Sequence, residues 1–414
     1  MTELISRRSD CRLCGGLDLS LVLQLAPTPP ANAFVPEMDL PNTQTRFPLD
    51  VFFCEACHHV QLCDVVNPGL LFENYVYVSG TSPVFVRHFK EYADSVLDFN
   101  LRGRTGLAID IGSNDGTFLR FLKDAGYDVL GIDPARDIAA SASAQGIETL
   151  PTFFSAELGR HLRQERGGAL LVTANNVFAH IDDLDDVADG VRSMLLDDGL
   201  FVFEASYFVD VYEQTLFDTI YHEHLAYHTV GPLDRFLAAH DLDLVRVDRV
   251  ASHGGSIRCY AQPAGGPLAR DASVDHLIAL EAQIGLNRAE TLRGFAARID
   301  HVRDELLQVI KTIRDRGERI AAFGAPAKAT TLMYHFGLGP DVVEFIVDDS
   351  PLKQGLYSPG LHIPVLPSDA LYEQRPDYAI ILAWNFAEPI MRNHARFLED
   401  GGHFIVPLPA PEIH

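Results

Sequence analysis

The sequence has few positive charges. Its 33 Lys and Arg residues face 57 Asp and Glu residues, which gives a formal net charge of −24. A surface this acidic repels phosphate backbones, so we expect neither nucleic acids nor anionic membranes as partners. An anionic substrate would need a locally basic pocket.

Long apolar runs are also missing. No run reaches the ~20 residues that a membrane span needs, and no apolar segment follows Met1–Arg8 as in a signal peptide. These absences predict a cytoplasmic protein. In that compartment its six cysteines are not expected to form a disulfide framework.

Four of the cysteines form two CxxC pairs, Cys11 with Cys14 and Cys54 with Cys57, with 39 residues between the pairs. Two thiolates three positions apart suit one edge of a tetrahedral metal site, and the second pair completes a closed four-sulfur zinc site. A closed site is structural, because no position is open for a reactant. The alternative is four unrelated reduced cysteines.

The remaining chain alternates between strand and helix patterns, and its 414 residues suggest two or three domains. We expect a doubly wound parallel sheet, with ligands at the carboxyl ends of its strands, and a second, smaller Rossmann-type unit from residue 320. A helical pattern at 270–316 connects the two. The strands expected in the first sheet are 107–111, 128–132, 170–174, 199–205, 243–249 and 256–261; the helices are near 116–126, 135–145, 184–196 and 231–240.

The turn at Leu107–Leu119 indicates a ligand site. A strand enters Gly112, a helix follows Gly116, and such a turn brings backbone N–H groups to a ligand. The next strand ends at Asp133, where nucleotide-binding folds place a ribose-binding carboxylate. The dinucleotide pattern GxGxxG is absent, and the acidic loop suits a cationic ligand better than a pyrophosphate. The alternative is an ordinary α/β turn without a ligand.

Tyr221–His228 is the densest cluster of reactive side chains and follows a strand on the same edge as Asn175–His180. Its three histidines allow general acid–base chemistry, a metal site or a plain surface loop. The sequence of the aromatic segment 67–85 supports two interpretations equally, a core element and a substrate-lining loop. Lys328 and Lys353 are candidates for the local positive charge that an anionic substrate needs. The alternative is that both are solvated surface lysines.

Taken together, these motifs resemble the sugar-nucleotide C-methyltransferases of deoxysugar biosynthesis, and the turn itself resembles the S-adenosylmethionine site of class I methyltransferases. The resemblance implies an α/β protein with a zinc-binding domain (1–70), a class I methyltransferase (Rossmann-like) domain (71–265), connector helices (266–318) and a smaller Rossmann-like α/β domain (319–414). The family methylates a carbon beside a keto group, commonly carbon 3 of a dTDP-4-keto-deoxyhexose, through a base-generated enolate. Such chemistry needs no metal, which disfavours a metal at the histidines.

The resemblance assigns His224 as the base, Tyr221 to orient the sugar or stabilise the enolate, and Glu223, His180 and Tyr75 as supporting groups. The implied cofactor residues are Asp110, Gly112, Ser113, Asn114, Asp115, Gly116, Asp133, Phe153, Phe154, Asn175 and Asn176. The implied substrate residues are Tyr77, Ser79, Thr81, Ser82, His222, Lys328 and Lys353. A nucleotide-linked keto sugar is the expected partner, with no obligate protein partner. The alternatives are carbon 5 methylation, an additional NADPH-dependent ketoreductase activity, or a non-catalytic zinc-containing binding protein.

Overall fold

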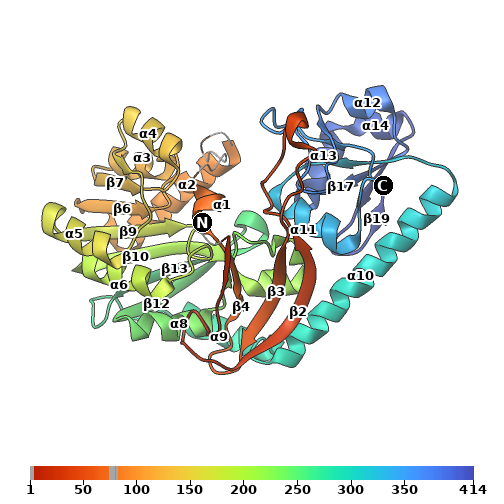
Figure 1. Cartoon of the computed structure of the whole chain (residues 1–414). Coiled ribbons are helices and arrows are strands. Elements are labelled where there is room, and N and C mark those ends of the chain that lie inside the picture. The colour runs from red at the N-terminus through yellow and green to blue at the C-terminus, as the bar shows by residue number, and fades with distance from the viewer. Residues whose placement is uncertain (1–3, 74–79, 81–82) are drawn as a thin grey trace.

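The computed structural model describes residues 4–73, 80 and 83–414 (Figure 1). Five of the implied site residues lie outside the described residues: Tyr75, Tyr77, Ser79, Thr81 and Ser82. Within the described part, the chain forms a seven-stranded, a six-stranded, a four-stranded and a two-stranded sheet. No helix in that part combines the length and the hydropathy that crossing a bilayer requires.

The seven-stranded sheet confirms the predicted doubly wound fold. Five consecutive strands of this sheet run parallel, and a hairpin of two strands continues it antiparallel at one edge. The direction of this hairpin follows from its short connection, residues 251–255, because a parallel crossover needs about a dozen residues. The strand order is β12 (Leu242–Val250), β13 (Ser256–Pro263), β10 (Leu195–Ser206), β9 (Ala169–Asn175), β6 (Leu107–Ile111), β7 (Asp128–Ile132) and β8 (Thr149–Leu150).

Alternate residues of these strands enter two different cores. Ile109 and Ile111 of β6 belong to one core, which α5, α6 and α8 cover, whereas Ala108 belongs to the other, which α2 and α3 cover. The helix α5 and the short strand β8 were not predicted. The helices around this sheet are α2 (Pro83–Val96), α3 (Thr117–Asp124), α4 (Arg136–Ala144), α5 (Ala156–Arg166), α6 (Leu184–Met194), α7 (Phe208–Glu213) and α8 (Val230–Ala239).

The N-terminal part is antiparallel and is built into the rest of the molecule. β2 (Leu19–Thr28), β3 (Phe47–Cys54) and β4 (Val60–Leu62) form one sheet. Its fourth strand, β11 (Ala226–Tyr227), comes from the histidine-rich segment, Tyr221–His228. β1 (Ile5–Arg7) pairs with β5 (Asp64–Val66), and α1 (Pro68–Phe72) follows. The histidine-rich segment is therefore fixed to the cysteine-bearing sheet by backbone hydrogen bonds.

Two helices occupy the predicted helical stretch, α9 (Ala272–Ile284) and α10 (Ala289–Asp315), and Gly285 ends the first in a left-handed conformation. Figure 1 shows α10 as a long rod that runs past β2 and β3 towards the C-terminal sheet. One face of α10 is buried, as its apolar spacing of threes and fours predicts. The buried residues on this face include Leu292, Phe295, Ile299, Val302, Leu306, Ile310 and Ile313.

The C-terminal sheet has five parallel strands and one antiparallel edge strand, which confirms the second, smaller α/β unit. Its order is β16 (Val365–Leu366), β15 (Ile346–Val347), β14 (Ile320–Phe323), β17 (Tyr378–Ile381), β18 (His403–Val406) and β19 (Glu412–Ile413). Its helical elements are α11 (Ala327–Phe336), α12 (Ala370–Gln374), the single turn η6 (Trp384–Phe386), α13 (Ala387–Asn393) and α14 (Ala395–Glu399).

Each α/β sheet has a point where the strand order reverses. In the large sheet the chain builds β6, β7 and β8 outwards and then returns to place β9 on the other side of β6. In the small sheet the same reversal falls between β14 and β17. Ligands of open α/β sheets bind outside the carboxyl ends of the strands at such a point. In the large sheet, the residues that follow β6 and β9 are therefore the expected place of a ligand site.

Candidate active site and metal centre

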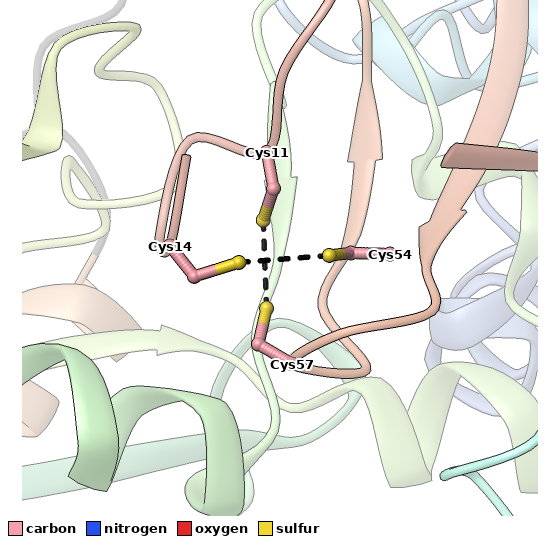
Figure 2. Close-up of side chains that lie close together, drawn as sticks. All are labelled: Cys11, Cys14, Cys54 and Cys57. Atoms are coloured by element: carbon pink, nitrogen blue, oxygen red, sulfur yellow. Dashed lines mark hydrogen bonds between the residues drawn. The ribbon is translucent and has the colours of Figure 1, made fainter. Parts of the chain in front are cut away.

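The four cysteines of the two CxxC pairs converge on one point (Figure 2). Cys11 Sγ lies 3.5 Å from Cys57 Sγ, Cys14 Sγ lies 3.6 Å from Cys54 Sγ, and all four sulfur atoms lie within 4.8 Å of one another. Zinc–sulfur bonds of about 2.3 Å in a tetrahedron place the sulfur atoms about 3.8 Å apart, so the cluster fits Zn²⁺. The close contact lowers the pKa of the Cys11 thiol to about 5 and raises the pKa of Cys57, so this pair shares a proton that a bound metal ion would displace.

The cysteine cluster lies where the N-terminal part contacts α8. Cys54 ends β3 and β4 begins at Val60, so the second pair lies on the turn between two strands. Arg235 of α8 donates a hydrogen bond of 2.6 Å to the Cys57 carbonyl oxygen. Four sulfur ligands leave no open position, so zinc at this centre is structural.

The turn after β6 depends on glycine. Gly112 and Gly116 have φ angles of +71° and +74°, in the left-handed region that side chains disfavour. A Cβ atom on Gly112 would also overlap Val177 of the loop after β9. Gly116 is the N-cap of α3, as the sequence predicts. The backbone N–H groups of Gly112 and Ser113 donate to the Ile132 carbonyl oxygen and that of Gly116 to the Ser113 carbonyl oxygen, so these hydrogen bonds hold the turn at the reversal point of the sheet.

Two buried carboxyl groups flank this turn. Asp110 Oδ1 accepts hydrogen bonds from Thr173 Oγ1 at 2.6 Å and from Asn175 Nδ2 at 3.1 Å. Burial raises the pKa of Asp110 to about 7, although the Thr173 hydrogen bond opposes the shift. Asp133 accepts hydrogen bonds from the backbone N–H groups of Asn114 and Ala135, and burial raises its pKa as well. A cationic ligand nearby would stabilise both carboxylates.

A small pocket opens at this place, and the predicted cofactor residues line much of it. Ser113 Oγ and Asn175 Oδ1 are buried and have no hydrogen-bond partner among the described residues, so they are available to a ligand. Acidic groups and these two oxygens fit S-adenosylmethionine, which carries an amino group, a sulfonium and hydroxyls. The lining residues are Phe89, Asp110, Gly112, Ser113, Asn114, Asp115, Thr117, Phe118 and Asn175.

Other predicted cofactor residues have different surroundings. Phe154 is buried in the core, where it packs against Gly190 of α6, whereas Phe153 is 45% exposed. Asn176 adopts φ +55° and donates its backbone N–H to the Glu204 carbonyl oxygen at 2.9 Å. Asp115 closes the turn by accepting hydrogen bonds from Thr117 and from the Gly80 N–H.

The histidine-rich segment brings four aromatic rings together. The His224 ring centroid lies 4.2 Å from that of Tyr221 and 5.0 Å from that of His180, which in turn lies 5.6 Å from Phe72. His224 Nδ1 lies 2.7 Å from the Thr219 carbonyl oxygen. A carbonyl oxygen can only accept, so Nδ1 carries the proton and Nε2 carries the basic lone pair of the neutral ring.

The loop after β9 connects this cluster to the pocket. Val177 covers Gly112 of the pocket turn, and three residues later the His180 ring packs at a tilt against His224. The Ala179 carbonyl oxygen also accepts the backbone N–H groups of Leu225 and Ala226. The predicted base and the predicted cofactor turn thus share one short loop.

Neighbouring residues of the same segment point to different places. Glu223 is buried and accepts a hydrogen bond of 2.8 Å from Asn32 Nδ2. His222 packs its ring on Phe47, and its Nε2 lies 3.2 Å from the Pro48 carbonyl oxygen, so the structure places it against β3 and outside the ring cluster. Burial lowers the pKa of His222 to about 4.

The two predicted substrate lysines are partly buried at the edge of the C-terminal sheet. Lys353 Nζ donates to the Ala325 carbonyl oxygen at 2.6 Å. Lys328 Nζ lies 3.6 Å from Asp218 Oδ2 and 4.0 Å from the centre of the Trp384 ring. Burial lowers the pKa of both lysines. Neither is the freely solvated lysine that the sequence left as an alternative.

Sequence reasoning missed a buried ion pair beside the site. Glu204 of β10 and Arg258 of β13 are register partners, joined by an ion pair of 2.8 Å, and His88 Nε2 lies 3.0 Å from the Glu204 carboxylate. The Arg258 guanidinium also lies 4.0 Å from the centre of the Tyr92 ring. The available signal was a single charged residue in each of two mainly apolar runs, residues 199–205 and 256–261, because a lone buried charge needs a partner.

Comparisons with known proteins agree with this architecture. Three family models match consecutive parts of the chain: "Putative zinc binding domain" at residues 11–72, "Methyltransferase domain" at 85–247 and "C-methyltransferase C-terminal domain" at 251–409. The C-methyltransferase NovU of Streptomyces niveus is 36% identical over 413 residues, which cover 100% of this chain and 98% of that protein.

Two similar solved structures each match less than half of the chain. An S-adenosylmethionine-dependent methyltransferase from Clostridium acetobutylicum is 14% identical and matches 43% of this chain and 92% of its own, with a TM-score of 0.36. The PH0226 protein of Pyrococcus horikoshii is 16% identical and matches 47% of this chain and 98% of its own, with a TM-score of 0.38. Identity along the whole length with NovU, together with the three family models, shows that the chain belongs to the S-adenosylmethionine-dependent C-methyltransferases with an N-terminal zinc-binding domain and a C-terminal α/β domain.

Proposed function

We propose that the protein methylates a carbon beside the ketone of a nucleotide-linked keto-deoxysugar, with carbon 3 of a dTDP-4-keto-deoxyhexose as the acceptor. The observation that carries this proposal is the setting of His224, whose Nδ1–H is bound to the Thr219 carbonyl oxygen. Methylation at carbon requires a base to remove a C–H proton, and a neutral imidazole with a defined basic nitrogen suits that task.

In the proposed reaction, His224 Nε2 removes the proton from the carbon next to the ketone, and the electron pair of that C–H bond forms an enolate. The resulting imidazolium is stabilised by the Thr219 carbonyl oxygen, since a hydrogen bond from a charged donor is stronger than one from a neutral donor. The Tyr221 ring, 4.2 Å from that of His224, brings a phenol to the same cluster, where its O–H can donate to the enolate oxygen.

The supporting groups fix the sugar. The His180 ring packs at a tilt against His224, with 5.0 Å between the ring centroids, and Glu223 accepts a hydrogen bond from Asn32, so both have defined orientations. Tyr75 completes the proposed set. Lys328 and Lys353 would attract the nucleotide diphosphate, because a net-acidic protein needs local cations for an anionic substrate.

The pocket at the β6 turn would hold the cofactor. S-adenosylmethionine supplies an electrophilic methyl group on its sulfonium. Asp110 would face the cationic part of this ligand, and Asp133 its ribose, as nucleotide-binding folds place a carboxylate after the second strand. The turn orients the donor, and the loop after β9 brings the base to it, so both reactants are aligned on one edge of the sheet.

The test is a comparison of His224→Asn with wild type on a panel of dTDP-4-keto-hexoses. Wild type should produce S-adenosylhomocysteine and a methylated sugar. It should also exchange carbon 3 hydrogen for deuterium in D₂O when S-adenosylhomocysteine replaces the methyl donor. His224→Asn should lose both activities by about 100-fold or more, with cofactor affinity nearly unchanged.

The matched control is His161→Asn, because His161 lies on the exposed surface of α5, with 68% of its side chain accessible. It should behave as wild type. Full turnover by His224→Asn would exclude His224 as the base. A wild-type protein that methylates none of the keto sugars would exclude the substrate class.

A further inference from the structure

The short segment that precedes the histidine cluster is held by the C-terminal domain. It forms the single turn η4 (Phe217–Thr219) and packs on α11. The Phe217 ring centroid lies 5.0 Å from that of Phe336 and 5.5 Å from that of His335, both near the end of α11. This segment belongs to the central half of the sequence, yet these aromatic neighbours come more than 100 residues later.

Asp218 makes the first polar attachment. Its side chain is fully buried, and its Oδ2 accepts a hydrogen bond of 2.6 Å from the Trp384 indole N–H. Lys328 Nζ lies 3.6 Å from the same oxygen and 4.0 Å from the centre of the Trp384 ring. Burying an ion pair contributes little net stability, because desolvation offsets the attraction, so stability alone is a weak reason to place one here.

Thr331 makes the second attachment. This buried threonine of α11 donates a hydrogen bond of 2.8 Å from its hydroxyl to the Ile220 carbonyl oxygen. The two attachments lie on either side of Thr219, whose carbonyl oxygen is 2.7 Å from His224 Nδ1. The oxygen that orients the His224 ring is therefore fixed, on both sides along the chain, by contacts with the C-terminal domain.

We propose that Asp218 and Thr331 are positioning residues through which the C-terminal domain sets the orientation of the His224 ring and the nitrogen that bears its basic lone pair. The proposal rests on the proposed function, in which His224 is the base. It gives the C-terminal domain a part in proton removal, because a displacement of about 1 Å in a catalytic group lowers the rate by about 100-fold.

The experiment uses the full-length protein and the variant Thr331→Val, which removes the hydroxyl and keeps the shape. We expect kcat to fall by about 10- to 100-fold, with KM and S-adenosylmethionine affinity within about twofold of wild type. Thermal stability and zinc content establish that each variant folds. Trp384→Phe removes the hydrogen bond to Asp218 and should have the same effect.

The matched control is Thr330→Val. Thr330 lies next to Thr331 on α11 and is also buried, but its hydroxyl donates to the Ala31 carbonyl oxygen at 3.1 Å. Its replacement removes the same kind of hydrogen bond at a different place, so the pH profile of turnover should stay that of wild type.

The pH profile separates positioning from a general structural effect. A weaker hydrogen bond from His224 Nδ1–H destabilises the imidazolium, so the acidic limb of the kcat profile should move to lower pH in Thr331→Val. The other titratable rings beside His224 are His180 and Tyr221, and the Tyr227 hydroxyl donates to the His224 carbonyl oxygen.

Two outcomes overturn different statements. If Thr331→Val and Trp384→Phe both match Thr330→Val in turnover and in pH profile while His224→Asn is inactive, the positioning role is wrong and the proposed function stands. If His224→Asn keeps full turnover, the proposed function itself is wrong in its choice of base. The double variant of Thr331 and Trp384 should lose less than the sum of the two single losses, because both bonds hold the same peptide.

Discussion

Replacing Asp110 by asparagine tests whether the buried Asp110 carboxylate destabilises the ligand-free protein and is stabilised when a cationic ligand binds. Burial raises the pKa of Asp110 from 3.8 to about 7, so the folded protein binds more protons at this group than the unfolded chain. The contribution of Asp110 to stability therefore falls as pH rises from about 4 to 7. At about 1.36 kcal/mol per pKa unit, the carboxylate destabilises the ligand-free protein by about 4 kcal/mol above pH 7.

The variant lacks this cost, because the introduced amide is neutral and its oxygen can still accept from Thr173 and Asn175. We expect Asp110→Asn to be more stable than wild type, by about 2 kcal/mol at pH 5.5 and about 4 kcal/mol at pH 8. For a domain of this size, the difference in melting temperature should grow by about 4–8 °C across that range. Calorimetric unfolding of both proteins with equal zinc at each pH measures it.

Cofactor binding should change in the opposite direction. Loss of a charged partner for the cationic ligand should weaken S-adenosylmethionine by about 1.5–3 kcal/mol, or roughly 10- to 150-fold in Kd, when titrated at pH 8. Wild-type affinity should also weaken as pH falls below 7, whereas that of the variant should not. Asp128→Asn is the control, since Asp128 is exposed at the opposite end of β7. The reasoning would be refuted if the difference in melting temperature between Asp110→Asn and wild type were no larger at pH 8 than at pH 5.5.

Two further predictions concern the pocket turn and the metal centre. Gly112→Ala should abolish measurable cofactor binding in a titration and lower stability by about 1–3 kcal/mol, because its φ is +71° and its Cβ would overlap Val177. Binding like that of wild type would contradict the tight approach at this turn. Cys57→Ser should lose the bound zinc, measured by elemental analysis, and unfold at a lower temperature; Cys63→Ser, a buried cysteine outside the cluster, should keep one zinc per chain. Equal zinc in both variants would argue against the four-sulfur site.

Local patterns predicted the elements whose determinants lie close together in sequence. The glycines of the β6 turn, the apolar face of α10 and the cysteines of each pair all act within a few residues, and the structure places them as expected. The antiparallel hairpin of β12 and β13 was also within reach, since residues 251–255 are too few for a crossover. The sequence pattern predicted a parallel direction for these two strands, because the alternation of strands and helices in the rest of the domain indicates a parallel sheet.

The site was predicted less completely, because neighbouring residues of one segment face different partners. His222 lies against β3, Glu223 contacts Asn32, and His224 joins His180 and Tyr221. No periodicity separates these three consecutive residues, since the segment is neither a regular helix nor a regular strand at that point. Their directions depend on which distant elements pack around them.

The sequence by itself determined the class of the molecule: a four-cysteine metal centre, a methyltransferase turn and a second α/β unit, each set by short-range chemistry. Only the tertiary structure decided how these parts cooperate. Asp218 contacts Trp384, which is 166 positions away, and Thr331 holds a carbonyl group 111 positions before it. Such contacts form when separate elements pack, because burial brings polar groups of distant segments together and requires them to find partners.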